Sequence, residues 1–174
     1  MEHLQIILVV HSSKYGVATK LAWAKSSSVT GDASSTTLTT GTIDATTFSQ
    51  AVFYVDTFVG GNMRLNGDTG SNYARRYSAN GAADETSASN DKMNWLYDLA
   101  PAFTVSYFIN ISAEEKLVLS FDVEQNTAGA GSAPNRMELV FKWSNTAAQI
   151  TEYAIAKTST NFTTAVNLTV LGTD

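Results

Sequence analysis

The segment Lys116–Gln125 constrains the fold more than any other part of the chain, because apolar and polar residues alternate along it. Successive side chains of a β-strand point to opposite faces of the sheet, so this period of two predicts a strand. We expect a second sheet to cover the apolar face of this strand, which consists of Leu117, Leu119, Phe121 and Val123. We expect water to meet the opposite face, which becomes polar toward its end and consists of Val118, Ser120, Asp122 and Glu124.

Further short segments rich in Val, Ile, Thr and aromatic residues recur along the chain, and polar or Gly-containing turns separate them. No long stretch keeps the 3.6-residue apolar period of an amphipathic helix. The pattern predicts ten strands: Leu4–Val10, Lys20–Lys25, Gln50–Phe58, Met63–Leu65, Tyr73–Ser78, Ala102–Ile111, Lys116–Gln125, Arg136–Trp143, Ile150–Lys157 and Asn167–Leu171. We therefore expect an all-β chain, folded as a two-sheet, jelly-roll-like β-sandwich in one domain over residues 1–174.

Two polar stretches interrupt this pattern. Residues 26–47 are rich in Ser, Thr and Gly, which predicts a long loop or an exposed edge hairpin. Residues 79–94 predict a second polar loop, with one helical turn around residues 87–92. The apolar run Leu4–Val10 is too short to span a bilayer and lacks a basic leader, so we expect a strand and no membrane insertion.

The composition excludes several function classes. A net charge of −5 and a pI near 4.9 leave no general basic field for nucleic acid, so no nucleic-acid partner is expected. The chain has no cysteine, which excludes disulfides and thiolate metal sites. Only His3 and His11 can supply imidazole ligands, and both bracket the first predicted strand.

Asp68-Thr69-Gly70 is the strongest candidate for catalysis, because an Asp-Thr-Gly triplet can form half of an aspartic-protease dyad. In that enzyme class the Asp follows a buried apolar strand. Here Asn66-Gly67 precede it and Asn72 follows, a context typical of a tight polar turn. The chain also lacks a Gly-x-Ser-x-Gly elbow, so we do not expect an enzyme.

Acidic residues of the polar loops are candidates for a cation site. Asp68, Asp84 and Glu85, together with Asp91, can offer oxygen ligands to a hard cation such as calcium. Their spacing matches no EF-hand or Gly/Asp repeat, and a solvated loop is the alternative. Calcium is the one cofactor that this set of residues suggests.

A row of Tyr73, Arg75 and Tyr77 projects from one face of a predicted strand. Such an aromatic–Arg–aromatic row can stack on sugars, on bases or on a neighbouring subunit, and ordinary cross-strand pairing is the alternative. The chain has three tryptophans: Trp23, Trp95 and Trp143. Tryptophans can form a platform for glycans, but all three lie in or beside apolar runs, where core or interface anchors are expected.

Four segments taken together resemble a family of small, uncharacterised virion-associated proteins of tailed phages and of marine viral and archaeal metagenomes. The segments are Arg64–Ala74, Asn80–Asp84, Gln125–Gly129 and Lys142–Thr151. The resemblance extends over residues 53–172, leaves the first fifty residues uncovered and brings no catalytic residues. It implies a virion-associated β-sandwich, located in the virion with other virion proteins as partners.

The expected function is therefore that of a structural virion protein, as a capsid decoration, fibre or tail component that acts by homo-oligomeric assembly. A Cys-free, hydroxyl-rich β-domain suits repetitive packing in which neighbours cover strand edges. Residues 1–12 are then a candidate arm that adds a strand to a neighbouring subunit. The alternatives are a carbohydrate-binding or receptor-binding β-sandwich module and a non-viral extracellular filament subunit.

Overall fold

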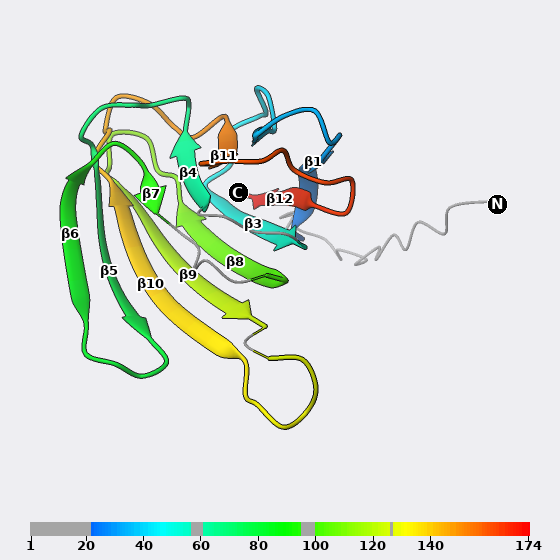
Figure 1. The fold of residues 1–174 in the computed structure, drawn as a ribbon. Coiled ribbons are helices and arrows are strands. Elements are labelled where there is room, and N and C mark those ends of the chain that lie inside the picture. Colours follow the sequence, from blue (N-terminus) through cyan, green and yellow to red (C-terminus); the bar gives the residue numbers. More distant parts are fainter. Residues whose placement is uncertain (1–21, 57–60, 95–99, 126) are drawn as a thin grey trace, which may run out of the picture.

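The chain folds into β-strands because apolar and polar side chains alternate along its segments and polar turns separate them. The computed structural model describes residues 22–56, 61–94, 100–125 and 127–174, and every regular element in these ranges is a β-strand (Figure 1). The strands are β1 Ala24–Thr30, β2 Thr37–Thr39, β3 Phe48–Val55, β4 Gly61–Leu65, β5 Tyr73–Ala79, β6 Glu85–Asn90, β7 Met93–Asn94, β8 Ala102–Ile109, β9 Lys116–Glu124, β10 Asn135–Trp143, β11 Tyr153–Lys157 and β12 Asn167–Thr173.

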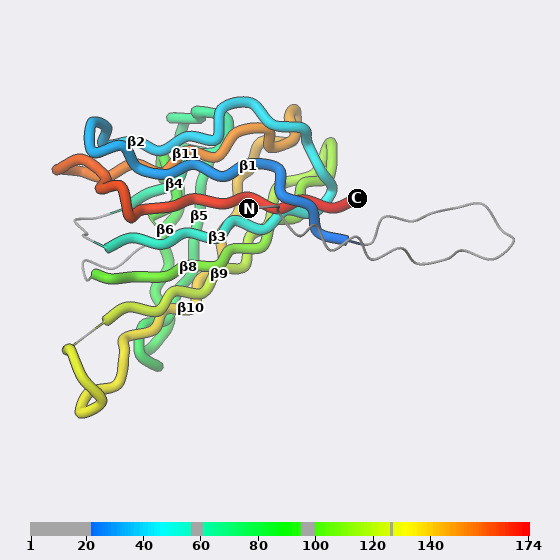
Figure 2. The backbone as a smooth tube through the Cα atoms, turned by 90° about the vertical axis from the view of Figure 1, so that its right-hand side faces the viewer, coloured from blue at the N-terminus to red at the C-terminus, as the bar shows by residue number. Residues whose placement is uncertain are grey.

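The strands form two antiparallel sheets. The large sheet has the order β1-β12-β3-β8-β9-β10-β5-β6, and the small sheet has the order β2-β11-β4-β7. Figure 2 shows β1, the red β12, β3, β8, β9 and β10 following one another across the large sheet. The orders β1-β12-β3-β8 and β2-β11-β4-β7 are those of a jelly roll, so the expected two-sheet, jelly-roll-like sandwich is confirmed.

Two inserted hairpins enlarge this jelly roll. The hairpin of β9 and β10 continues the large sheet from β8, and the hairpin of β5 and β6 continues it from β10. The insertions double the large sheet from four strands to eight, while the small sheet keeps four. The large sheet therefore offers much more surface than the small sheet can cover.

Three short strands were missing from the sequence prediction: β2, β6 and β7. Each is an edge strand, and β2 and β6 are mostly polar because one side of an edge strand meets water. The predicted helical turn at residues 87–92 is wrong, since β6 extends to Asn90 there. The predicted loop at residues 26–47 contains most of β1 and all of β2, which lie in different sheets and so form no hairpin.

The core lies between the two sheets. Its largest fully buried aromatic residues are Phe53, Tyr73, Phe108, Trp143, Tyr153 and Phe162. The rings of Phe108 and Tyr153 meet edge to face, 5.2 Å apart at 79°, which joins the two sheets. Asn110 ties the adjoining loops to this core, because its side chain donates to the carbonyl oxygens of Thr46 and Ile150 and accepts from the amide of Ile150.

The orientation of β9 is opposite to the sequence expectation. Leu117, Leu119, Phe121 and Val123 lie on the outer face of the large sheet, 40–52% exposed. The inner face carries Lys116, Val118, Ser120, Asp122 and Glu124, all buried. The inner side of β9 adjoins the apolar inner residues of β10 and the small polar residues of β8, and the hydroxyls of Ser106 and Ser120 pair at 2.7 Å.

Candidate functional site

The outer face of the large sheet, which faces away from the small sheet, is apolar over its central strands. Ten large hydrophobic residues there are each 39–52% exposed: Phe48, Tyr54, Phe103, Tyr107, Ile109, Leu117, Leu119, Phe121, Val123 and Val140. They come from β3, β8, β9 and β10, which are neighbours in the sheet. We call these ten residues the outer band.

Strand register makes the outer band continuous. Leu119 is paired with Tyr107 on one side and with Val140 on the other, so these three side chains form one row across the strands. The rows on either side are Phe48, Ile109 and Leu117, then Val52, Val105 and Phe121, then Tyr54, Phe103 and Val123. Directly paired side chains on one face lie about 5 Å apart, so the rows leave little polar surface between them.

Polar residues border the outer band on both sides. On β5 and β10 the border carries charges that pair within the chain, as Arg76 with Asp84 at 3.3 Å and Lys142 with Glu115 at 2.9 Å. On β12 and β1 the border is mostly uncharged apart from Lys25, and Ser28 and Thr169 share a hydrogen bond of 2.9 Å between their hydroxyls. An apolar, aromatic centre within a polar rim is the usual composition of a protein–protein interface.

The outer band is larger than the apolar patches that monomeric proteins expose. Large side chains have about 200 Å² of surface each, and ten of them at the exposures given above offer roughly 800 Å². The largest patch on a typical monomer is about 300–600 Å². A standard interface buries about 800 Å² on each partner, so the band alone is large enough for one.

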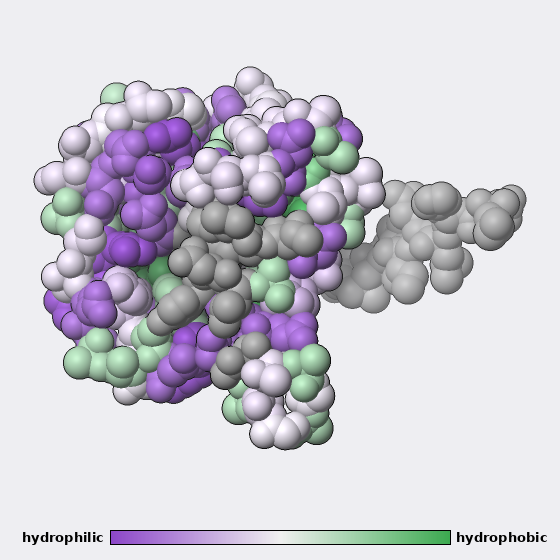
Figure 3. Space-filling model, in the orientation of Figure 1, coloured by the Kyte–Doolittle hydropathy of each residue, from purple (hydrophilic) through white to green (hydrophobic). Residues whose placement is uncertain are grey.

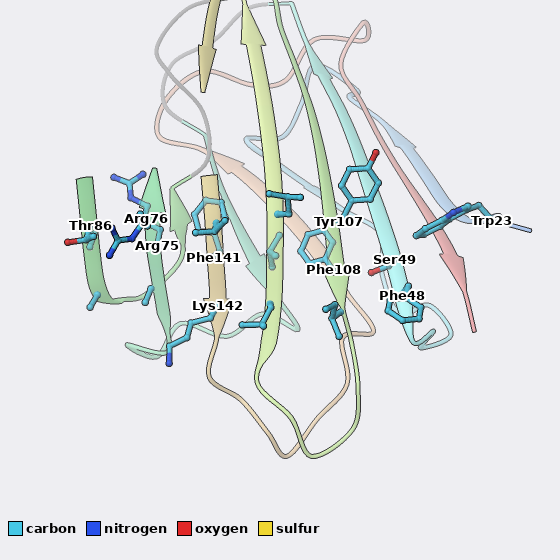
Figure 4. Close-up of a pocket in the computed structure, with 18 residues that line it drawn as sticks. Trp23, Phe48, Ser49, Arg75, Arg76, Thr86, Tyr107, Phe108, Phe141 and Lys142 are labelled. Carbon is cyan, nitrogen blue, oxygen red and sulfur yellow. The ribbon is translucent and has the colours of Figure 1, made fainter. Parts of the chain in front are cut away.

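Part of the outer face is hollowed into a trough of about 850 Å³ that crosses the strands (Figure 4). The exposed large apolar residues that line it are Trp23, Phe48, Tyr107, Ile109, Leu117, Leu119 and Val140. Figure 4 shows Trp23 and Phe48 at one end and Arg76 and Thr86 at the other. In the space-filling view of Figure 3, by comparison, hydrophilic and neutral residues make up most of the visible surface, and hydrophobic residues form small groups.

Tyr73, Arg75 and Tyr77 share one face of β5, as the alternation predicted, but this is the inner face. Tyr73 is 1% exposed and stacks on Trp143 at 6.4 Å, and burial raises its pKa to about 12. The Arg75 guanidinium lies 4.5 Å from the centre of the Tyr77 ring and donates to the carbonyl oxygen of Asn94. The hypothesis of a surface contact is therefore wrong for Tyr73, and the other two are half-buried.

The acidic candidates do not converge on one site. Asp68 lies beside the start of β5 and accepts hydrogen bonds from Asn72, Trp143 and the amide of Gly70. Asp84 and Glu85 lie beside its far end, where Asp84 pairs with Arg76 and Glu85 accepts from Tyr77. Among the described residues no group of three or more His, Cys, Asp or Glu side chains is placed to hold a metal ion.

The Asp68 turn is a structural element, as its Asn and Gly flanks predicted. Burial acts to raise the pKa of Asp68, but the hydrogen bonds from Trp143, Asn72 and Gly70 outweigh it and hold this pKa below its usual range. Asp68 Oδ2 accepts from Trp143 Nε1 at 2.6 Å. The carboxylate therefore anchors a core tryptophan.

The tryptophans divide between core and surface. Trp143 is 0% exposed, which confirms the core assignment, whereas Trp23 is 44% exposed and lines the trough. Trp95 lies outside the described residues, as do His3, His11 and Leu4–Val10. Sequence reasoning had named Trp23 as a candidate for a glycan platform or an anchor but missed the outer band, although the alternation of β9 had already placed four of the band residues on one face.

Asp122 is a buried acid directly beneath the outer band. It is 3% exposed, and its carboxyl oxygens make no well-formed hydrogen bond to the described part of the chain. Desolvation raises the pKa of Asp122 well above its usual value, the nearby hydroxyl of Thr104 lowers it, and the Glu124 charge raises it further. Ionising Asp122 therefore costs more in the folded protein than in the unfolded chain.

Asp122→Asn should stabilise the fold at neutral pH by about 1–3 kcal/mol, because the native carboxyl must either stay charged without compensation in the core or take up a proton on folding, and the amide avoids both costs. Since the folded pKa is raised, the native chain loses stability as pH rises from the unfolded value near 3.8 through the folded value. In Asp122→Asn this decline of folding stability with rising pH should be absent. Urea unfolding at pH 4 and pH 7 measures both effects, and an equal change with pH in the two proteins would contradict them.

Comparisons with protein-family models, curated proteins and solved structures find no match to this chain. Within the described ranges no helix is long and apolar enough to cross a membrane.

Proposed function

We propose that this chain is a structural protein that acts by homo-oligomeric assembly, with the outer band as its subunit interface. The single observation that carries the proposal is the continuous apolar face of roughly 800 Å², bordered by polar residues. A virion, with the chain as capsid decoration, fibre or tail component, is the setting that the sequence resemblance supports. The jelly-roll strand order is compatible with that setting, since capsid domains use it.

Association through the face is favoured over association through the edges of the large sheet. β1 pairs with β12 through a register shift between Lys25 and Ser27, and β5 pairs with β6 through a shift between Tyr73 and Arg75. Bulges of this kind twist an edge strand away from further pairing. Most of β1 and β6 is also polar, which leaves the outer band as the apolar surface to be covered.

A carbohydrate-binding module is the second candidate, because Trp23, Phe48 and Tyr107 expose aromatic rings around the trough. Rings of this kind stack on sugars, and lectin domains also use the jelly roll. The outer band is far wider than this aromatic group and most of it is aliphatic or lies elsewhere on the sheet. Self-association explains the whole band, and sugar binding explains only one end of it.

The experiment that tests assembly is the mass of the native chain by multi-angle light scattering over a range of protein and salt concentrations. We expect an oligomer of defined mass that persists at 1 M NaCl, because apolar contacts are not screened and the border charges on β5 and β10 are already paired within the chain. A monomer of 18.7 kDa at all concentrations would contradict assembly. A monomer that binds immobilised glycans would support the carbohydrate-binding module instead.

A further inference from the structure

We infer that the trough is filled by the apolar run at residues 4–10 of a neighbouring copy. The inference rests on the proposed assembly and names the segment that enters the hollowed part of the interface. It concerns the trough only, while the rest of the outer band packs against the body of the neighbour.

The shape of the outer face requires a protruding partner at this place. The trough is a hollow of about 850 Å³, and an identical hollow brought against it would double the empty space. Voids of that size are not found in well-packed interfaces, whose density matches that of protein interiors. A second copy must therefore contribute something other than the same hollow to this part of the contact.

The run Leu4–Val10 has the chemistry of the trough floor. It contains six aliphatic residues and one Gln and has no charge. The middle of the floor is likewise uncharged and apolar, with Ile109, Leu117, Leu119 and Val140. Both surfaces are apolar, and packing one on the other removes both from water, which is favourable.

The dimensions agree as well. The trough crosses six strands, from β3 to β6, and five spacings of about 4.8 Å give a length of about 24 Å. Seven residues in an extended conformation span about 23 Å. The run therefore matches the whole trough in length, and it matches the apolar middle of the floor, over β8, β9 and β10, in polarity.

The chain enters the described structure at the right place for such an exchange. Trp23 lines one end of the trough, so the residues that precede Ala22 join the described structure beside it. Twelve residues separate Val10 from Trp23 and can reach at most about 40 Å, which is enough to cross to a copy stacked on the same face. A row of arms passed between neighbours would join the copies more firmly than face contacts alone.

Disulfide trapping tests the inference. Because the chain has no native cysteine, every disulfide must form between introduced residues. One chain carries Ile7→Cys, and a second, separately purified chain carries Leu117→Cys in the trough. The two are mixed, equilibrated and oxidised mildly, and disulfide-linked pairs are measured on a non-reducing gel. The matched control replaces Leu117→Cys by Ser28→Cys, which lies on the exposed edge strand β1 outside the trough.

We expect at least tenfold more mixed disulfide with Leu117→Cys than with Ser28→Cys. Equal yields of mixed disulfide with the two variants overturn the inference. In a second experiment one chain carries both Ile7→Cys and Leu117→Cys, and a disulfide that forms only within single chains, never between two chains, also overturns the inference. As a second readout, Leu8→Asp should weaken the oligomer at least tenfold, while Ser13→Asp, outside the run, should leave it unchanged. If outer-band variants dissociate the oligomer but no mixed disulfide forms, the proposed function stands and the arm exchange does not.

Discussion

Leu119→Glu should raise the dissociation constant of the oligomer by about 30-fold to 1000-fold. Leu119 lies in the middle of the outer band, with Tyr107 and Val140 as its lateral neighbours. A charge placed at the centre of an apolar interface loses the hydration that it has in the free subunit, and losses at such central positions are about 2–4 kcal/mol. The fold should be unaffected, because Leu119 is already 45% exposed in the isolated chain.

The control for this variant is Ser28→Glu, which adds the same charge on β1, four strands away from β9 in the same sheet. We expect the native mass to persist with Ser28→Glu and to fall to 18.7 kDa with Leu119→Glu at micromolar concentration. Dissociation is measured by light scattering during dilution, and far-ultraviolet circular dichroism checks that both variants are folded. An oligomer equally stable in both variants would exclude the outer band as the interface.

The positions of most strands were predictable because they depend on local alternation of apolar and polar residues. Which face of a strand points toward the core was not predictable. The period of two in Lys116–Glu124 shows that the two faces differ, and either face can point inward. Pairing decided the outcome, since β10 directs Leu139 and Phe141 inward and the neighbouring small residues of β8 leave room for Ser120. A single sequence carries no direct signal for such pairing between distant segments.

Turn chemistry was predictable for the same local reason. The Asn and Gly residues around Asp68 indicated a tight turn, and Asp68 Oδ1 accepts from the amide of Gly70 at 2.7 Å as such turns do. Of the two donors to Asp68 Oδ2, Asn72 is local, but Trp143 was not predictable because it lies 75 residues further along the chain. The short edge strands β2 and β6 were missed because solvent on one side leaves them without an apolar period.

Trp143→Ala should destabilise the fold by about 3–5 kcal/mol, the usual cost of removing a large buried aromatic side chain. Trp143 is fully buried at the end of β10, where it stacks on Tyr73 and donates to Asp68 Oδ2. At about 2–4 °C per kcal/mol for a chain of this length, the midpoint of thermal unfolding should fall by roughly 10 °C. Trp23→Ala is the matched control and should change the stability of the monomer by less than about 0.5 kcal/mol.

Trp143→Phe separates the hydrogen bond from the packing. It keeps an aromatic ring against Tyr73 but removes the Nε1 donor, which is one cause of the lowered pKa of Asp68. A group with a lowered folded pKa contributes stability above its unfolded pKa and loses it as pH falls through the folded value. In Trp143→Phe the pKa of Asp68 should rise. The stability that Asp68 contributes at pH 7 should therefore be smaller than in the native chain. As pH falls, this contribution should also be lost at a higher pH than in the native chain. Urea unfolding between pH 2 and pH 7 measures this change, and a difference from the native chain that stays constant with pH would mean that Asp68 and Trp143 are not coupled.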